Sequence, residues 1–469
     1  MFEATAPTLE PIGTTGIVLR SGVAIADTRG PTPHSTAIAA GVFRPVQYLG
    51  AKARVLEALL KAAALELDAN APVVDIFSGS SLVAQGLARR GHPVAAYDAL
   101  EHCTHFARAL LGAGRLDGET APEPDTLPQV RSDWVAAWQP WVDTEDLALA
   151  DSDPDSLIAL TREIPQVWRP SAAVGSLAQV LSRMTPGGSD AAGLIAAHYA
   201  GTYFGIRQAV ELDELRSRIA AARSQGALSA WQESVLITAL LSAASECVFS
   251  AGKHYAQPHR IRPGKDLSFI RKRILSDRCK SIGTLFHERV ALVVNSVVPA
   301  GDHHVETSTL ERLARSPNLL KRPAAVYADP PYTAQQYSRF YHVPEIISRY
   351  RVPTLATVNR RVTRGLYPTE RHKSRFCSRR LAPAAFADLC RLVVAQDATL
   401  LLSYSYSRNG ETGNRRAIDL PDLRSLLRSF FTDVRECEIA LTYRQFNSRA
   451  AAVAARSDVE LLIVATNHA

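Results

Sequence analysis

The residues best suited to chemistry form one short run, Asp329-Pro330-Pro331-Tyr332, in a chain of 469 residues. The apolar segment from Ala324 to Tyr327 precedes the run and predicts a buried strand. Because proline lacks an N–H group and fixes its own φ, the two prolines hold the Asp329 carboxylate and the nearby carbonyl groups rigidly after that strand. Rigid acceptors beside an aromatic ring can bind a planar amine, such as the exocyclic NH2 of a base. The alternative is a strand that ends in a turn with an incidental acid.

A second candidate site lies near the N-terminus, where an apolar segment is followed by Asp75-Ile76-Phe77-Ser78-Gly79-Ser80. The pattern predicts a strand, a turn of small residues and then a helix. Small residues expose backbone N–H groups at a helix start, which favours binding of a carboxylate or phosphate. The next predicted strand ends in Asp98, and an acid there can accept hydrogen bonds from ribose hydroxyl groups. This spacing fits one β-α-β unit that binds a nucleoside.

The run Gln47-Tyr48-Leu49-Gly50-Ala51-Lys52 leads into apolar residues at helical spacing. Gly50 lets the backbone approach a ligand closely, and Lys52 near the helix start is placed to meet a carboxylate. Taken alone, the run is more simply interpreted as a loop that enters a surface helix.

Residues 253–289 form a basic segment with interleaved aromatic residues. Basic side chains neutralise phosphates, and aromatic rings stack on bases. The simpler alternative is a solvated helix face. We expect contact with nucleic acid from this segment and from two residues after Tyr332, namely Lys253, Arg260, Arg262, Lys265, Arg271, Lys272, Arg273, Tyr337 and Arg339.

The composition fits a globular protein, with 46% hydrophobic and 21% charged residues. A net charge of +7 permits a polyanionic partner without requiring one. The six cysteines are widely spaced and form no C-x2-C pair, so neither a metal site nor a redox motif is indicated. We expect no secretory signal and no membrane span, which favours a reducing cytosolic compartment.

Other segments predict structure rather than chemistry. We expect residues 1–40 to form a loosely ordered arm. Trp134, Trp138 and Trp141 are interpreted as core residues rather than as a platform for bases, because large aromatic side chains usually pack. The apolar run Val290 to Val298 is interpreted as a strand.

In this order, the motifs resemble the D12-class DNA adenine-N6 methyltransferases, a group that includes Dam-like enzymes. The resemblance spans residues 44–112 and 305–467. It implies an α/β fold in which residues 41–114 and 300–469 form a Rossmann-like class I methyltransferase sheet. Residues 115–299 would be a large, mainly helical target-recognition region inserted into it. The carriers are Gln47 to Lys52, Asp75 to Ser80, Asp98, Asp329 to Tyr332 and the closing strands.

The resemblance implies transfer of the methyl group of S-adenosylmethionine to the N6 amine of a flipped adenine in duplex DNA, without a metal. Asp329 and the Pro330 carbonyl would accept hydrogen bonds from the amine. Pro331 would stiffen the turn, and Tyr332 would stack on the base. The residues that would bind the cofactor are Tyr48, Gly50, Lys52, Asp75, Phe77, Ser78, Gly79, Ser80 and Asp98.

The chain departs from the family pattern at two positions. Ser81 stands where relatives often have another glycine, and Ser308 stands where they often have an acid, with Glu306 nearby. Two alternatives remain: an N4-cytosine or RNA amino-methyltransferase, and a catalytically silent DNA-binding subunit of a modification or defence system. The resemblance further implies a bacterial, cytoplasmic protein that joins the nucleoid through DNA. A cognate nuclease or other defence-system subunits are additional candidate partners.

Overall fold

The computed structural model describes residues 37–38, 41–47, 52–130, 133–170, 173, 175–188, 191–261, 266–407, 416–440 and 458–467. All of them belong to one compact unit, Thr36–Ala469. Most of the predicted arm at residues 1–40 lies outside the described residues. Its last part contributes β1 (Ala37–Ile38), which pairs antiparallel with β2 (Val42–Phe43).

A seven-stranded, mostly parallel sheet organises this unit and confirms the α/β class. β11 is antiparallel to both β9 and β10, and every other pair of neighbouring strands is parallel. The chain runs from β3 to β4 and β5 on one side and then returns to β6 on the other side of β3, so the strand order reverses between β3 and β6. In spatial order the strands are β10 (Asp433–Ala440), β11 (Asp458–Thr466), β9 (Thr399–Ser407), β6 (Ala325–Ala328), β3 (Val73–Asp75), β4 (Val94–Asp98) and β5 (His304–Thr307).

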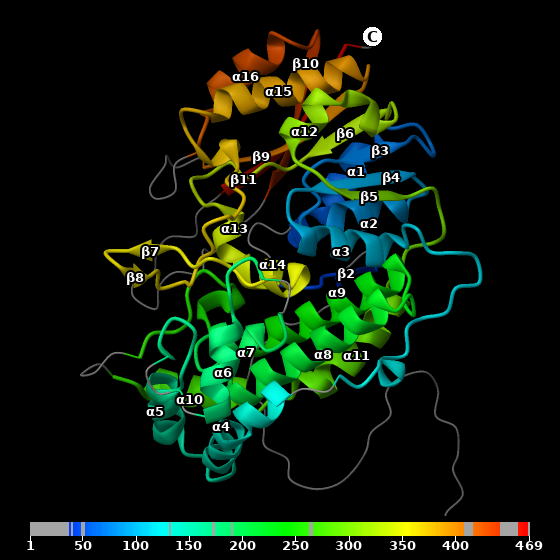
Figure 1. Cartoon of the computed structure of the whole chain (residues 1–469). Helices are drawn as coiled ribbons and strands as arrows, with labels where there is room; N and C mark the ends of the chain where they lie inside the picture. Colours follow the sequence, from blue (N-terminus) through cyan, green and yellow to red (C-terminus); the bar gives the residue numbers. More distant parts are fainter. Residues whose placement is uncertain are drawn as a thin grey trace, which may run out of the picture. The chain divides into compact units, whose positions relative to one another are not determined.

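Helices cover both faces of the sheet (Figure 1). Successive side chains of a strand point to opposite faces, so in β6 Val326 packs with one helical layer and Tyr327 with the other. Burial on both faces explains why these strands are continuous apolar runs in the sequence. One layer contains α1 (Leu56–Ala64), α2 (Leu82–Ala88) and α3 (Glu101–Leu111), and the other contains α12 (Leu310–Arg315), α15 (Ala382–Ala395) and α16 (Leu420–Arg428).

The segment between α3 and β5 is mainly helical, as predicted for residues 115–299. Its core continues into α3 and α14 (His342–Arg349), because Phe106 and Ile347 belong to the same buried cluster. Trp134 and Trp138 are buried in this cluster, which confirms their interpretation as core residues. The predicted domain boundaries stay a prediction. The helices are α4 (Asp133–Ala150), α5 (Pro154–Glu163), α6 (Gly175–Arg183), α7 (Leu194–Tyr199), α8 (Ile206–Ser224), α9 (Ala230–Cys247), α10 (Ser268–Arg278) and α11 (Ile282–Asn295).

The strand predicted at Val290 to Val298 was wrong, because most of this run belongs to α11. The buried residues Phe286, Val290 and Val293 recur at helical spacing, whereas Leu292 between them is exposed. A short apolar run cannot by itself separate a buried strand from a helix, and the longer helical pattern decides the outcome here.

The remaining elements lie mainly between β6 and β9. They include α13 (Tyr337–Phe340), the short strands β7 (Thr357–Val358) and β8 (Arg361–Val362), and the 3-10 helix η6 (Arg375–Cys377). Further 3-10 helices are η1 (Lys52–Arg54), η2 (Pro124–Thr126), η4 (Ala251–Lys253) and η5 (Pro317–Leu320). Within the described ranges, every helix is too short or too polar to cross a membrane.

Candidate active site

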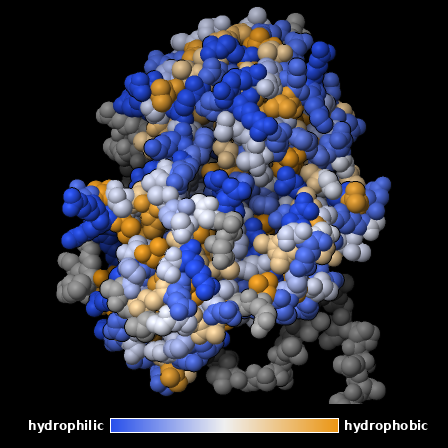
Figure 2. Space-filling model, viewed as in Figure 1, coloured by the Kyte–Doolittle hydropathy of each residue, from blue (hydrophilic) through white to orange (hydrophobic). Residues whose placement is uncertain are grey.

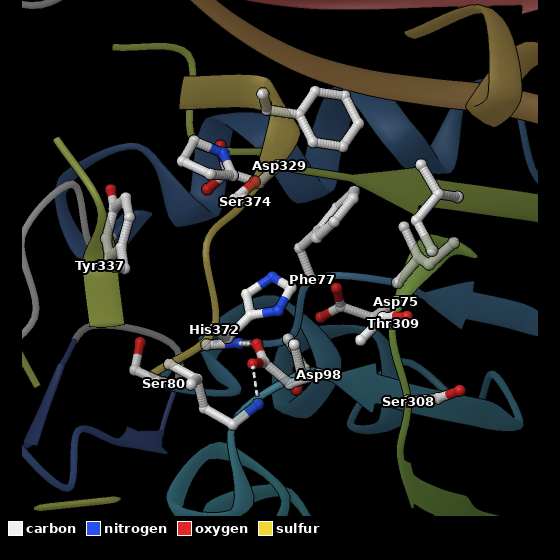
Figure 3. Close-up of a pocket in the computed structure, with 18 of the residues that line it drawn as sticks. Asp75, Phe77, Ser80, Asp98, Ser308, Thr309, Asp329, Tyr337, His372 and Ser374 are labelled. Atoms are coloured by element: carbon white, nitrogen blue, oxygen red, sulfur yellow. Dashed lines mark hydrogen bonds between the residues drawn. The ribbon is translucent and has the colours of Figure 1, made fainter. Parts of the chain in front are cut away.

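A pocket opens at the carboxyl ends of β3, β4 and β6, where the strand order reverses. Open α/β sheets bind their ligands at such a point. The pocket encloses about 1020 Å³, part of which is open to solvent. The predicted site residues that line it are Lys52, Asp75, Phe77, Ser78, Gly79, Ser80, Asp98, Asp329, Pro331 and Tyr337. Figure 3 labels six of them, namely Asp75, Phe77, Ser80, Asp98, Asp329 and Tyr337.

The loop between β3 and α2 turns sharply beneath this pocket. Gly79 and Ser81 both have left-handed backbones, with φ values of 50° and 61°. Glycine adopts this conformation freely, whereas a serine is strained in it. The Ser78 N–H group donates to the Tyr97 carbonyl, which ties the loop to β4. As a result, the N–H group of Gly79 faces the end of β4.

Asp98 ends β4 and receives two backbone hydrogen bonds. The Gly79 N–H group donates to Oδ2 and the Leu100 N–H group to Oδ1, each at 2.9 Å. Burial raises the pKa of Asp98, although these two N–H groups oppose the change. A carboxylate oxygen can accept more than one hydrogen bond, so Asp98 retains acceptor capacity for the hydroxyl groups of a ligand.

Asp75 ends β3 and is only 1% exposed. Burial raises its pKa well above the ordinary value, and the carboxylates of Asp329 and Asp98 add to the effect. Its Oδ1 atom has no hydrogen-bond partner among the described residues. Because a buried acceptor without a donor costs about 1–3 kcal/mol, this position favours a ligand that brings an N–H or ammonium group.

Asp329 is held by a residue that we expected beside the cofactor. Lys52 Nζ lies 3.0 Å from Asp329 Oδ1 and 2.7 Å from Glu460 Oε1. Burial disfavours the ammonium form, but the two carboxylates keep the pKa of Lys52 well above its ordinary value. Burial raises the pKa of Asp329 to about 6, with Lys52 lowering it and Glu460 raising it. The Ser403 hydroxyl donates to the same Glu460 oxygen and fixes that side chain.

The rest of the Asp-Pro-Pro-Tyr run is well supported, although only Asp329 and Pro331 line the pocket. Pro330 is buried, and Tyr332 stands half-buried beside the pocket. The Tyr332 ring centroid lies 5.4 Å from that of Tyr404 and 5.2 Å from the Arg416 guanidinium carbon. These contacts fix the orientation of the aromatic ring at the end of the turn.

Part of the pocket wall comes from residues that the sequence analysis did not single out. The Gln336 side chain exchanges two hydrogen bonds with the backbone of Ser374, at 3.0 and 2.8 Å. Phe376 packs edge-on against Phe77, with 5.3 Å between ring centroids. Residues 372–376 therefore close over the loop that follows β3. Their irregular backbone gives no periodic signal that could have identified them.

The family departure at Ser308 also lies in this wall. Ser308 is buried, and its Oγ atom has no hydrogen-bond partner among the described residues. Glu306 forms an ion pair with Arg312 at 2.9 Å and is absent from the pocket lining. The hydroxyl of Ser308 is thus an unpaired polar group beside Thr309 at this end of β5.

The predicted DNA contacts divide into exposed and structural residues. The prediction for Lys253 was wrong, because its side chain is buried and Nζ lies 2.9 Å from Asp277 Oδ1. Arg273 forms an ion pair with Asp277 at 2.7 Å, and Arg271 forms one with Asp155 at 2.9 Å. A run of basic letters does not show which side chains face inward, and the helix packing decides this.

The remaining residues predicted to contact DNA or the cofactor differ in exposure, and some of them lie outside the described part of the chain. Lys272 and Arg339 are exposed, and Arg260 is half-buried. Four of them, Tyr48, Gly50, Arg262 and Lys265, lie outside the described residues.

No known protein-family model matches this sequence, and no curated protein is significantly similar to it. Within the described part of the chain, no group of three or more His, Cys, Asp or Glu side chains is arranged to hold a metal ion.

Proposed function

We propose that this chain is an S-adenosylmethionine-dependent DNA methyltransferase that modifies the N6 amine of adenine in duplex DNA, as its resemblance to the D12 class implies. One observation carries the proposal: Asp75, Asp98 and Asp329 line a single pocket at the ends of three adjacent strands. The first two belong to a nucleoside-binding pattern, and the third begins the Asp-Pro-Pro-Tyr run. A donor site and an acceptor site for one reaction would therefore be neighbours.

The strand order supports a nucleotide-binding sheet. We number the seven strands of this sheet from 1 to 7 in chain order, starting at β3. Across the sheet, from the β5 edge to the β10 edge, their order is then 3-2-1-4-5-7-6. Without the antiparallel β11, this becomes 3-2-1-4-5-6, the order of doubly wound sheets that bind dinucleotides. On this basis we assign the sheet to the Rossmann-like methyltransferase type.

The polar groups of the pocket fit S-adenosylmethionine, which when bound supplies an electrophilic methyl group on a sulfonium centre. Asp98 retains acceptor capacity for the ribose hydroxyl groups. The unpartnered Oδ1 of Asp75 would accept a hydrogen bond from the ammonium of the methionine moiety. Ser78, in the loop between β3 and α2, also lines the pocket, and its buried hydroxyl has no hydrogen-bond partner among the described residues.

Asp329 and the Pro330 carbonyl would prepare the adenine amine for attack. The lone pair of an aromatic amine is delocalised into the ring, which makes the amine a poor nucleophile. Two rigid acceptors favour the pyramidal amine, whose lone pair can point at the methyl group. Lys52, which is itself paired with Glu460, holds Asp329 in place for this role. The adenine must leave the duplex at a cost of a few kcal/mol, and stacking on Tyr332 offsets about 1–3 kcal/mol of it.

The decisive experiment follows tritium from labelled S-adenosylmethionine into duplex DNA, with analysis of the nucleosides. We expect label in N6-methyladenine, and we expect Asp329→Ala to abolish transfer while the circular dichroism spectrum is unchanged. Asp422→Ala, at an exposed acid of α16, is the matched control and should remain active.

Each alternative function gives a different result in this assay. Label in N4-methylcytosine, or in RNA alone, would replace the adenine assignment. Tight DNA binding without any transfer would favour the silent subunit. An active Asp329→Ala variant would refute the role proposed for this carboxylate.

A further inference from the structure

Between α14 and α15 the chain forms a β-hairpin that projects from the rest of the structure (Figure 1). β7 and β8 pair antiparallel through Thr357 with Val362 and Val358 with Arg361. The two residues between the strands, Asn359 and Arg360, have φ values of 50° and 61°. Two positive φ values in a two-residue loop are those of a type I′ turn, which suits the twist of a hairpin.

Arg360 is an unusual residue for this turn. Glycine is favoured at its position, because a left-handed backbone is strained for a residue with a Cβ atom. The Arg360 side chain is exposed, and none of the ion pairs among the described residues involves it. The strained, exposed arginine at the tip is therefore a candidate contact for a partner, and the charge around it bears on the kind of partner.

The surroundings of the hairpin are strongly basic. Residues 349–380 contain Glu370 as their only acid, together with many arginines. Arg360, Arg361 and Arg364 are exposed at or beside the hairpin. Figure 2 shows strongly hydrophilic side chains at the edge of the view where the hairpin lies. The charge and the projection together fit a polyanionic partner that is deep enough to receive a ribbon.

The hairpin is connected to the proposed active site through its base. Leu355 and Pro368 form a β-bridge below the two strands. The next side chain along, Tyr367, is covered by the guanidinium groups of Arg339 and Arg371, whose carbons lie 4.9 and 5.8 Å from the ring centroid. His372, which directly follows Arg371, lines the pocket. A cationic strip therefore leads from the hairpin to the pocket rim.

We propose that the β7–β8 hairpin enters the major groove of duplex DNA beside the target base and reads the flanking base pairs. The inference rests on the proposed function only for the position of that target base. The major groove admits a two-stranded ribbon, where arginine pairs with guanine and asparagine with adenine. Asn359, Arg360 and Arg361 stand at the tip, and Arg339 and Arg371 neutralise phosphates between the hairpin and the pocket.

Arg360→Gly tests the proposal without endangering the fold, because glycine relieves the strained backbone while it removes the charge. The matched control is Arg322→Gly. Arg322 is also exposed and has a φ of 51°, but it precedes β6 and so lies at the other end of the sheet. Fluorescence anisotropy of the full chain with a short duplex should show binding about fivefold to a hundredfold weaker for Arg360→Gly. Arg322→Gly should bind like the wild type.

Equal duplex affinities of Arg360→Gly and the wild type would overturn the proposal. An equal loss on single-stranded DNA would also overturn it, since the hairpin would then supply charge without reading a groove. Sequencing of methylated bases in a host that expresses each variant should show a relaxed motif for Arg360→Gly. If the wild type methylates nothing but Arg360→Gly still weakens duplex binding selectively, the proposed function fails and the hairpin inference stands.

Discussion

The buried group of Lys52, Asp329 and Glu460 combines one cation with two carboxylates. A single ammonium must therefore stabilise both acids, of which Glu460 is buried and Asp329 is 22% exposed at the pocket. The Asp329 carboxylate is the acceptor that would face the substrate amine, and its ionisation depends directly on these two neighbours. Lys52 and Glu460 are accordingly positioning residues for Asp329, and they are expected to set the pH at which it works.

The pH dependence of methylation should report this coupling. Asp329 accepts strongly as a carboxylate, and its pKa is raised to about 6, so kcat/KM should fall as the pH falls through about 6. Glu460→Gln removes a negative charge that raises this pKa, so the acid limb should move to lower pH. Rates measured with duplex DNA across this range test the shift. Glu57→Gln, an exposed acid of α1, should leave the profile unchanged, and identical limbs for all three proteins would contradict the coupling.

The strained backbone at Ser81 predicts a stabilising substitution. Ser81 is buried with φ 61°, and its hydroxyl has no hydrogen-bond partner among the described residues. Ser81→Gly should raise the free energy of unfolding by about 1 kcal/mol, because glycine adopts this conformation without strain. Ser81→Ala loses the hydroxyl but keeps the strain, so the difference between the two variants in urea unfolding isolates the backbone contribution. A less stable glycine variant would refute this explanation.

At the scale of the element, α10 shows how one basic helix serves two purposes. Its last residue, Arg278, is fully buried and lies 3.1 Å from the carboxylate of Glu145 on α4. Arg271, two turns earlier, forms an ion pair with Asp155 in which both side chains are exposed. The inner end of the helix fixes it to the helical region, whereas the outer part presents Lys272 and Arg271 to the solvent.

Substitutions on α10 should separate these purposes. Arg278→Leu leaves the buried Glu145 carboxylate without its cation, so it should lower the free energy of unfolding by about 3–5 kcal/mol. Arg271→Leu breaks an exposed pair and should cost less than about 1 kcal/mol. Chemical denaturation of both variants provides the comparison. Similar losses for the two would mean that burial does not govern the contribution of these ion pairs.

At the scale of the whole molecule, the pocket joins segments that are far apart in the chain. Lys52 lines the pocket and pairs with Glu460, which follows it by 408 residues, and residues 372–376 close the wall over the loop after β3. A ligand in this pocket therefore contacts both halves of the sheet and stabilises only the folded chain.

S-adenosylhomocysteine, the product form of the proposed cofactor, should accordingly stabilise the whole unit. At 100 times its Kd it should add about 2.7 kcal/mol to the free energy of unfolding. Asp98→Asn replaces one carboxylate oxygen by an NH2 group, so the side chain loses acceptor capacity for the ribose hydroxyl groups. This variant should therefore lose most of the stabilisation by the ligand. Thermal unfolding with and without ligand measures both values. A full ligand shift in Asp98→Asn would exclude Asp98 from the binding site.

Features that are encoded by neighbouring residues could be predicted from the sequence, whereas contacts between distant residues could not. The unit from Val73 to Asp98 was predicted because its strands, turn and helix are encoded by neighbouring residues. The strand before Asp329 was predicted for the same reason. Glu460 is an acid directly before the apolar run of β11, a signal that could have marked it, but its partner Lys52 is not visible from local sequence.

The sequence by itself determined the β-α-β unit from Val73 to Asp98, the strand-end acids and the rigid Asp-Pro-Pro-Tyr turn, since these depend on periodicity and on the backbone limits of proline. Only the tertiary structure decided that Lys52 holds Asp329, that Lys253 is buried, and that Gln336 and Phe376 wall the pocket. Such contacts arise when sheet order and helix packing bring distant segments together. Their electrostatics depend on burial, which no single stretch of residues encodes.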